Sequence, residues 1–509
     1  MRKKASILFL LKALKIPVYI INLSLTAKYF GVSIERDAWI LAFSAMILID
    51  TALWGPINET FRAKFIFIKE KEGEQIALRK TRSMLFFVIV FSLLISAVIM
   101  KFPQLLSVVI APKYSGNELS VLNEIIVYST SVLLVNQLMQ IGISVLNAYD
   151  SFYIPEISGF ISSLLTLVLI VWLAPIIGIY ALLIGYLVGS IILILFLVLH
   201  LRKRGVAIFA DFFNFRFKDF GEFFLFSLPM FAPLFLYQIN TFIEKALSST
   251  LGVGLVSVLD YGRKIPELLL TVFVSIITAL LLPVLSRHYI RGEMEKFQIS
   301  FTQIFNIGIL FMTLLMGMMF VGGEVIIRFL YDKGQISDQM LAQILNLSQF
   351  YVISLLGSFV QIIFGISLIA TDQNKLMGIV VAGGQVLMIV VNFVFLNHLK
   401  IYVFPASLFV INLIIGIVIY SLIKFDKILI GKSFLKYSLF FLLNVVVAYF
   451  IGSKMFFLEN KLLNAILLYL IFITVLIGEL FIFKIEERKV LVQGMSIIKK
   501  IKNQKIKRF

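Results

Sequence analysis

The chain has 509 residues, of which 60% are hydrophobic and only 15% are charged, whereas soluble domains average ~45–50% apolar and ~25% charged residues. Its net charge is +18, because 46 Lys and Arg outnumber 28 Asp and Glu. The absence of cysteine excludes disulfides, thiolate metal sites and a thiol nucleophile. Zinc-protease, Walker A and serine-hydrolase motifs are also missing. The composition therefore predicts a multi-pass membrane protein, and the missing motifs disfavour hydrolytic and ATP-driven chemistry. We expect a protein that is not an enzyme and has no cofactor.

Fourteen segments are apolar enough to cross a bilayer, since about 20 residues at ~1.5 Å each span ~30 Å of hydrocarbon. In chain order they cover residues 5–29, 38–62, 83–108, 120–147, 153–174, 177–201, 221–246, 252–285, 297–322, 340–370, 375–397, 402–424, 434–456 and 462–484. With both termini in the cytoplasm, 32 of the 46 basic residues fall in cytoplasmic segments and 10 in outer ones. This bias matches the positive-inside rule. We therefore expect an all-α polytopic fold with about 14 transmembrane helices and both termini cytoplasmic.

Short sequence matches recur at an interval of about 222 residues, which maps the first six spans onto the next six. The matching pieces are Gly31-Val32 with Gly252-Val253, Gly142-Ile143-Ser144 with Gly365-Ile366-Ser367, Ala148 and Asp150 with Ala370 and Asp372, and Ile179-Tyr180 with Ile401-Tyr402. Six is an even number, so the two halves have one orientation and form a parallel repeat. The alternative is a coincidence between two apolar halves. The predicted domains are an N-lobe (1–201), a cytoplasmic linker (202–220), a C-lobe (221–425), an extra helix pair (434–484) and a basic tail (485–509).

Two lysines lie inside the first predicted span, where a charge costs at least ~2.5–3.5 kcal/mol unless it meets water or a partner. Lys12 and Lys15 are three residues apart and so share one helix face. If the helix instead begins at Ile16, Lys15 lies at the membrane surface. Otherwise these lysines line a cavity.

The second span carries Asp50 and, five residues later, Gly55-Pro56, which predicts a kink or an interruption. A salt bridge between Asp50 and one of the lysines of the first span would lower the cost of burying both charges. Such a pair would serve either structure or transport.

The eighth span has the densest charge cluster, in the string LDYGRKIPELL. Asp260, Arg263, Lys264 and Glu267 follow the i, i+3, i+4, i+7 spacing of one helix face. Asp260–Lys264 and Arg263–Glu267 pairs would partly neutralise it, and Pro266 would loosen the helix there. We interpret this face as a cavity wall that contacts an anionic ligand; the alternative is an internally neutralised stripe packed against the seventh span.

The seventh span carries Gln238, Asn240 and Glu244, whose oxygens suit a Na⁺ or H⁺ site. Glu244 lies near the predicted outer end, which favours a solvated carboxylate over an ion ligand. The tail sequence KKIKNQKIKR has no acidic residue, so we expect it to bind anionic lipids rather than nucleic acid.

Several strings resemble the lipid II flippase (MurJ/MviN) family of the multidrug/oligosaccharidyl-lipid/polysaccharide (MOP) exporter superfamily. The best match is QINTFIEKALSSTLGVGLVSVLDYGRKIPELLLTVFVSIITALLLPVLSRHY, and two further strings are YFGVSIERDAWILAF and GEVIIRFLYDKGQIS. The resemblance covers nearly the whole chain. It implies two six-helix lobes around a cationic cavity, and a groove for a lipid tail formed by the extra helix pair. It also implies roles in transport for Asp37, in the F-G…D-A stretch, and for Arg263, in the Y-x-x-R run.

The resemblance implies a flippase in the bacterial cytoplasmic membrane that moves a polyprenyl-pyrophosphate-linked saccharide, with lipid II for peptidoglycan synthesis as the first expectation. Cell-wall synthesis proteins are candidate partners. We expect alternating access in which Lys12, Lys15, Arg263 and Lys264 attract the pyrophosphate, driven by membrane potential or by a Na⁺ or H⁺ gradient. The sequence departs from the family's arginines in the first two spans, where Ile16, Asn22, Asp50 and Thr51 stand instead.

Three alternatives remain open. A flippase for O-antigen, capsule or teichuronic repeat units would fit the departures from the family pattern. A multidrug exporter would normally lack the last helix pair. A polyprenyl-phosphate-dependent glycosyltransferase would use Glu35 and Asp37 as catalytic acids, but the predicted outer loops are short.

Overall fold

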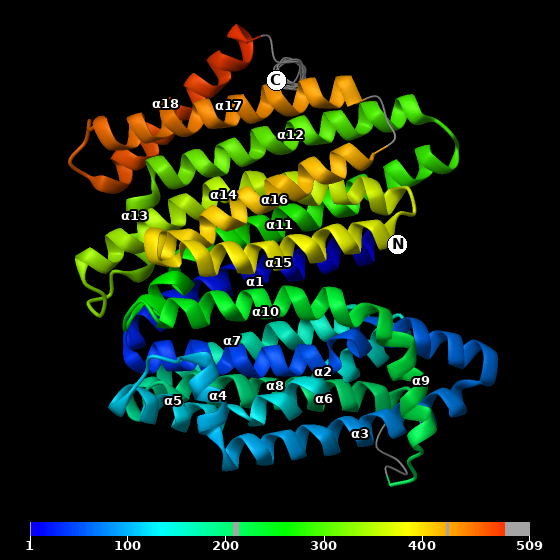
Figure 1. The fold of residues 1–509 in the computed structure, drawn as a ribbon. Coiled ribbons are helices and arrows are strands. Elements are labelled where there is room, and N and C mark those ends of the chain that lie inside the picture. Colours follow the sequence, from blue (N-terminus) through cyan, green and yellow to red (C-terminus); the bar gives the residue numbers. More distant parts are fainter. Residues whose placement is uncertain (1, 207–212, 424–426, 484–509) are drawn as a thin grey trace, which may run out of the picture. The chain divides into compact units, whose positions relative to one another are not determined.

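The computed structural model describes residues 2–206, 213–423 and 427–483, and within these ranges all regular secondary structure is helical. The helices are α1 (Arg2–Phe30), α2 (Ile34–Glu72), α3 (Glu74–Lys101), α4 (Pro103–Ile110), α5 (Gly116–Ser129), α6 (Ser131–Ala148), α7 (Tyr153–Ile177), α8 (Tyr180–Lys203), α9 (Phe217–Ser227), η1 (Leu228–Met230), α10 (Phe231–Ser249), α11 (Leu255–Ile290), α12 (Met294–Val321), α13 (Gly323–Tyr331), α14 (Asp338–Ala370), α15 (Asn374–Leu399), η2 (Lys400–Tyr402), α16 (Val403–Leu422), α17 (Lys427–Lys454) and α18 (Lys461–Ile482) (Figure 1). The all-α prediction is confirmed.

Ten helical stretches in the described residues are long and apolar enough to span a membrane, or eleven if α9 and α10 form one bent span. One of the ten covers both α15 and α16, and the charged helices α1 and α11 are not among them. Each of the fourteen predicted segments nevertheless coincides with a helix or a broken helix. The chain is therefore a multi-pass membrane protein with roughly the predicted number of spans.

Two prolines behave differently from each other in the apolar helices. α2 continues without interruption through Pro56, where a kink or an interruption was predicted. The stretches Phe217–Met230 and Phe235–Ser249, by contrast, meet at a bend of 69°. Pro229 lies in the 3₁₀ turn at this bend, which is expected because proline cannot donate the helical hydrogen bond.

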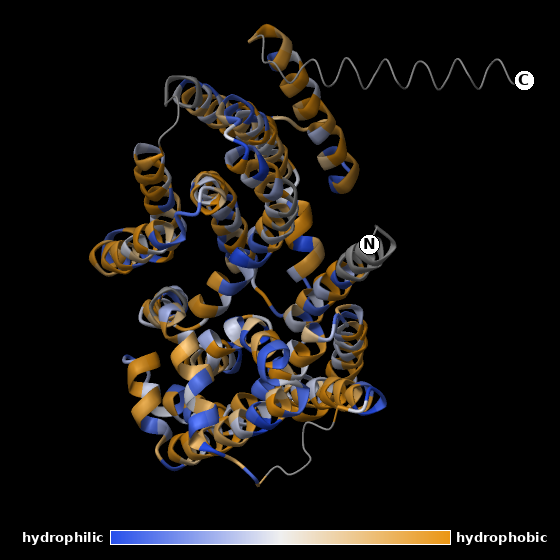
Figure 2. Cartoon of the chain, turned by 90° about the vertical axis from the view of Figure 1, so that its right-hand side faces the viewer, coloured by the Kyte–Doolittle hydropathy of each residue, from blue (hydrophilic) through white to orange (hydrophobic). Residues whose placement is uncertain are grey.

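Contacts within the chain define two compact units. Unit 1 comprises Met1–Asp260, Leu330–Leu341 and Gln385–Ile401; unit 2 comprises Tyr261–Phe329, Ala342–Gly384 and the described residues from Tyr402 onward. In unit 1, α2 is central and packs against α3, α5, α6, α9 and α10. Most helical turns are apolar, with hydrophilic turns interspersed among them (Figure 2).

Small residues allow the helices of each unit to pack closely. In unit 1, a Cβ on Gly189 of α8 would come within 2.7 Å of the hydroxyls of Ser162 and Thr166 on α7. In unit 2, Gly317 of α12 leaves room for the ring of Phe472 on α18. The predicted last helix pair corresponds to α17 and α18, and both of its helices pack against α12.

The turns that end corresponding helices have the same backbone geometry. Asp150 and Asp372, which are 222 residues apart, have positive φ angles of 56° and 60°. The following amides donate to carbonyls five residues back, Ser151 to Leu146 at 3.0 Å and Gln373 to Leu368 at 2.8 Å. The sequence repeat is therefore also a repeat of local backbone conformation.

Candidate functional site: buried polar networks along the central helix

Asp37 lies in the first turn of α2, which Ser33 caps by accepting a hydrogen bond from the amide of Arg36 at 3.2 Å. The Asp37 carboxylate is completely buried. It accepts hydrogen bonds from the amide of Gly254 at 2.6 Å and from the amide and hydroxyl of Ser257 at 2.7 and 2.5 Å. Because these amides belong to the start of α11, the carboxylate caps that helix and interacts favourably with its dipole.

A second contact joins the starts of α2 and α11, and here α2 supplies the donor and α11 the acceptor. Arg36 of α2 donates from Nη2 to Oδ2 of Asp260 on α11 at 3.0 Å, and the two side chains are 6% and 9% exposed. Gly254 has φ of +85°, and a Cβ there would come within 2.6 Å of Val32. The chain thus needs glycine to bring α11 onto α2. We call Asp37, Gly254, Ser257, Arg36 and Asp260 the N-terminal junction of α2 and α11.

Tyr114, between α4 and α5, is a buried neighbour of this junction. Burial raises the pKa of its hydroxyl above the usual range, and the negative charges of Asp37 and Glu118 raise it further. Tyr114 therefore stays neutral and adds no charge to the junction.

Asp50 lies about two fifths of the way along α2 and is bound by neutral amides. Its two carboxylate oxygens accept from Asn136 Nδ2 at 2.5 Å and Gln137 Nε2 at 2.7 Å, both on α6. The predicted salt bridge of Asp50 with Lys15 is therefore wrong, and the side chain of Lys12 lies outside the described part of the structure. The polar pair Asn136-Gln137 in an apolar span was a signal that the sequence analysis missed.

Lys15 pairs with a carboxylate on α7 instead. Its Nζ lies 2.5 Å from Oε2 of Glu156, and the two side chains are 35% and 26% exposed. Gly159, one turn further along α7, leaves room for the lysine, since a Cβ there would lie 3.3 Å from Nζ. α1 is continuous from Arg2 to Phe30, so the alternative in which the helix begins at Ile16 is wrong.

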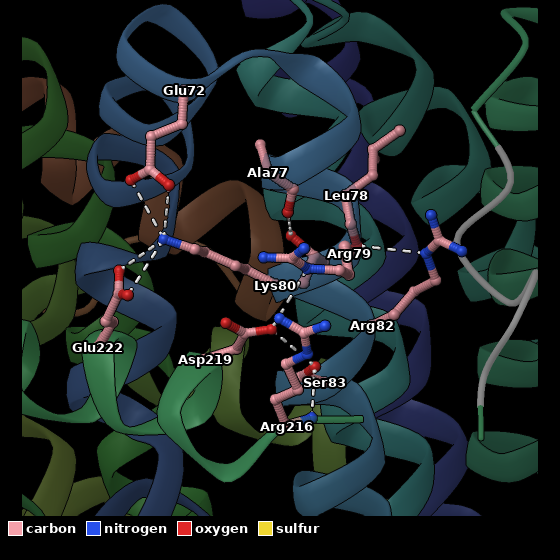
Figure 3. Close-up of polar contacts among 11 residues, drawn as sticks. Glu72, Ala77, Leu78, Arg79, Lys80, Arg82, Ser83, Arg216, Asp219 and Glu222 are labelled. Atoms are coloured by element: carbon pink, nitrogen blue, oxygen red, sulfur yellow. Dashed lines mark hydrogen bonds and ion pairs between the residues drawn. The ribbon is translucent and has the colours of Figure 1, made fainter. Parts of the chain in front are cut away.

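A third network lies at the other end of α2, where α3 and α9 begin (Figure 3). Lys80 Nζ lies 2.9 Å from a carboxylate oxygen of Glu72 and 2.9 Å from one of Glu222, and its side chain is 6% exposed. Beside it, Asp219 accepts from the hydroxyl of Ser83 at 3.2 Å. Ser83 in turn accepts from the amide of Arg216 at 3.1 Å. The start of α9 is thus tied to the α2–α3 connection by a buried lysine and a buried aspartate.

Replacing Lys80 with methionine keeps the apolar stem but leaves Glu72 and Glu222 facing each other. Because each carboxylate is about a third exposed, water screens part of the repulsion, and we expect a loss of about 1–3 kcal/mol in the free energy of unfolding. Thermal unfolding of the purified protein measures it. Lys71→Met, in an exposed lysine of the same connection, is the matched control. Equal losses in the two variants would show that Lys80 does not hold these helices together.

In unit 2, α11 carries the remaining charges of its predicted cluster. Arg263 Nε donates to Oε1 of Glu267 one turn later, with side chains that are 17% and 43% exposed, so this predicted pair is confirmed. Lys264 is partly buried. Ser348 of α14 donates to the carbonyl of Gly262 at 2.9 Å, which fixes α14 beside the charged turn. Asp260 is bound to Arg36, and its pair with Lys264 stays a prediction.

The candidate cation ligands of α10 are mostly buried in unit 1. Asn240 Nδ2 donates to Gln385 Oε1 at 2.8 Å and lies 3.0 Å from the sulfur of Met388. Gln238 is half-buried. Glu244 is 4% exposed, so its interpretation as a solvated carboxylate is wrong.

Unit 2 also contains a cavity of about 420 Å³ between α12, α13, α14, α17 and α18. Its polar lining includes Glu324, Gln349, Lys454, Lys461 and Asn464, and its apolar lining includes Tyr449 and Leu468. Lys461 contacts Glu324 at 3.3 Å. The cavity therefore offers both charged and apolar surface beside the last helix pair.

Helices of this length, with charged side chains buried between them, define a multi-pass membrane protein with the fold of MOP-superfamily transporters. The fold matches an inward-facing MATE multidrug resistance transporter of that superfamily with a TM-score of 0.62 and 14% identity, over 84% of this chain and 95% of the transporter. The family model described as lipid II flippase MurJ matches residues 26–477. The chain therefore belongs to the lipid II flippase MurJ family.

Two proteins described as lipid II flippase MurJ are similar to this chain. A solved structure of lipid II flippase MurJ in an inward closed conformation matches with a TM-score of 0.76 and 21% identity, over 93% of this chain and 100% of the other. A probable lipid II flippase MurJ of Borreliella burgdorferi is 24% identical over 318 residues. That match spans 62% of this chain and 62% of the relative's length.

Proposed function

We propose that the protein is a flippase that moves lipid II from the cytoplasmic to the outer leaflet of the bacterial cytoplasmic membrane by alternating access. The family match over residues 26–477 carries this proposal. Both termini would lie in the cytoplasm, with the basic tail held at anionic lipids. Membrane potential or a cation gradient would supply the energy, and Gln238, Asn240 and Glu244 are candidate ligands for a coupling Na⁺ or H⁺.

The charged pairs of α1 and α11 support an anionic headgroup as substrate. Lys15 and Arg263 keep 35% and 17% of their side chains exposed while each contacts one carboxylate. A pyrophosphate can compete for such cations, because it offers more negative charge than Glu156 or Glu267. Lys12 and Lys264 are further candidate cations for the headgroup, and Asp50 and Asp260 are candidates for setting the polarity of the substrate path.

The N-terminal junction supports a mechanism with a closed state. Asp37, Arg36 and Asp260 hold the start of α11 onto α2 through buried contacts that exclude water. A transporter that opens at this end has to break these contacts and form others. We propose that the junction is a latch that is closed in the described state.

The second candidate is a flippase for O-antigen, capsule or teichuronic repeat units. It is favoured by Asp50 and Thr51, which stand where the family resemblance leads one to expect an arginine pair. A glycosyltransferase is disfavoured, because Asp37 is completely buried and its carboxylate is occupied by Gly254 and Ser257.

Complementation distinguishes the two flippase candidates. We expect the gene to restore growth in a strain depleted of its lipid II flippase and not to restore capsule in a capsule-flippase deletion. The opposite pattern would assign the second candidate. Rescue of neither strain, with the protein present in the membrane, would contradict both.

Arg263→Ala is expected to reduce lipid II translocation in proteoliposomes by at least tenfold, since a charged hydrogen bond is worth about 1.5–3 kcal/mol. Arg263→Lys should recover only part of the rate, because lysine lacks the planar fork that binds phosphate oxygens in pairs. Arg287→Ala, at the exposed end of the same helix, is the control and should leave transport unchanged. An unchanged rate in Arg263→Ala would remove this residue from the substrate site.

A further inference from the structure

We propose that Asp50 is a reversible proton-binding site, built by α2, α6 and α8 within unit 1. The carboxylate is 4% exposed, and its two direct partners, Asn136 and Gln137, are 8% and 0% exposed. Neither partner carries a charge. A buried carboxylate with uncharged partners is costly when ionised, so it tends to be neutralised by a proton or a bound cation.

The described surroundings contain no compensating cation. Tyr186 of α8 faces the cluster through a contact of 3.4 Å to Asn136 Oδ1, and a tyrosine hydroxyl supplies no positive charge. The elements packed against α2 carry other charged side chains, which are Glu74, Arg79, Lys80, Arg82, Lys101, Glu118, Glu124, Lys218, Asp219, Glu222, Glu244 and Lys245. Among the described residues none of them forms an ion pair with Asp50.

The amide partners can serve both protonation states. In the described arrangement each carboxylate oxygen accepts one amide N–H, at 2.5 and 2.7 Å, which suits the ionised form. A half-turn of either amide exchanges its N–H₂ for its carbonyl oxygen, which can then accept a hydrogen bond from a protonated carboxyl.

The hydrogen-bond partners of Asn136 and Gln137 can adjust to such a half-turn. Gln137 Oε1 accepts from Asn58 Nδ2 at 3.2 Å, and Asn136 Oδ1 contacts the hydroxyl of Tyr186. A hydroxyl can donate or accept, and an amide can present either end. No partner need therefore be left unsatisfied when the proton arrives.

The same contacts favour a proton over Na⁺. A sodium site needs several oxygen atoms directed at one point, whereas amide nitrogens face both oxygens of Asp50. If the protein is the flippase proposed above, proton uptake at Asp50 would couple transport to the proton gradient. This coupling rests on the proposed function, whereas proton binding at Asp50 does not.

Infrared difference spectra of the full-length protein between acidic and alkaline pH test the site without transport. We expect a carboxylic-acid carbonyl band that is lost in Asp50→Asn and retained in Glu156→Gln, the matched control. Asn136→Leu keeps the acid but removes one donor to the ionised form, so its band should persist to higher pH. A band that is identical in the wild type and Asp50→Asn overturns the proposal.

Tryptophan fluorescence provides an independent reading, since Trp54 lies one turn from Asp50 on α2. In a Trp39→Phe, Trp172→Phe background, emission should change with pH, and Asp50→Asn should abolish that change. A change produced by Na⁺ at constant pH would identify a sodium site and refute proton binding. Translocation in proteoliposomes separates the two proposals. If the rate does not change with a pH gradient while the infrared band persists, only the coupling of transport to protons is rejected. If no translocation occurs, the proposed function is rejected.

Discussion

Asp37→Ala should abolish lipid II translocation and lower the free energy of unfolding by about 3–5 kcal/mol. The substitution removes three hydrogen bonds to a buried carboxylate, each worth about 1.5–3 kcal/mol when made to a charge. It also leaves the amides of Gly254 and Ser257 without their acceptor inside a dry junction. Thermal unfolding and a proteoliposome assay measure the two effects.

Glu35→Ala is the matched control, because Glu35 occupies the same first turn but is exposed. Its effect on stability should stay within about 0.5 kcal/mol. Asp37→Asn retains one carbonyl acceptor and should lose less stability than alanine. If Asp37→Ala were as stable as Glu35→Ala, the cap on α11 would have no energetic importance.

Arg36→Ala and Asp260→Ala should each lower the free energy of unfolding by about 3–5 kcal/mol, because removing one member of a buried pair leaves the other charge desolvated. The double variant should cost clearly less than the sum of the single ones. An Arg36→Met, Asp260→Leu variant, which replaces the pair with apolar groups, should regain much of the stability. Denaturation of the four proteins gives the coupling energy.

The apolar replacement also separates stability from transport. If the junction is a latch that has to open, the Arg36→Met, Asp260→Leu variant should be nearly as stable to heat as the wild type. It should nevertheless translocate more slowly than the wild type. Strict additivity of the two single losses would show that Arg36 and Asp260 do not act as a pair. Normal transport by the apolar variant would mean that its charges are dispensable for opening.

Hydrophobicity predicted the helices well, because it is a local property that each span carries in its own residues. The predicted segment 221–246 was placed correctly, but the bend of 69° between Met230 and Phe235 was not predicted. Conversely, Pro56 suggested a break that α2 does not contain. A neighbouring helix can hold a proline-containing helix continuous, and the sequence of one span does not reveal that support.

The site was predicted less completely, because its partners are distant in sequence. The pair of Arg263 with Glu267 follows from helical spacing and was predicted. Arg36 and Asp260 are 224 residues apart, so only the folded chain brings them together. Asp50 was correctly singled out as a buried charge, yet its amide partners could not be chosen from many polar residues in other spans.

Two turns of the chain can be compared by the φ angle of the residue at which each occurs. Gly178 and Lys400, 222 residues apart, both have positive φ, at 58° and 52°. Glycine adopts that conformation freely, whereas lysine is strained in it. The two positions thus share nearly the same φ although only one of them is glycine. At these two reversals of the chain the backbone dihedral angle is matched although the residue type is not, so the turn does not require glycine at both positions.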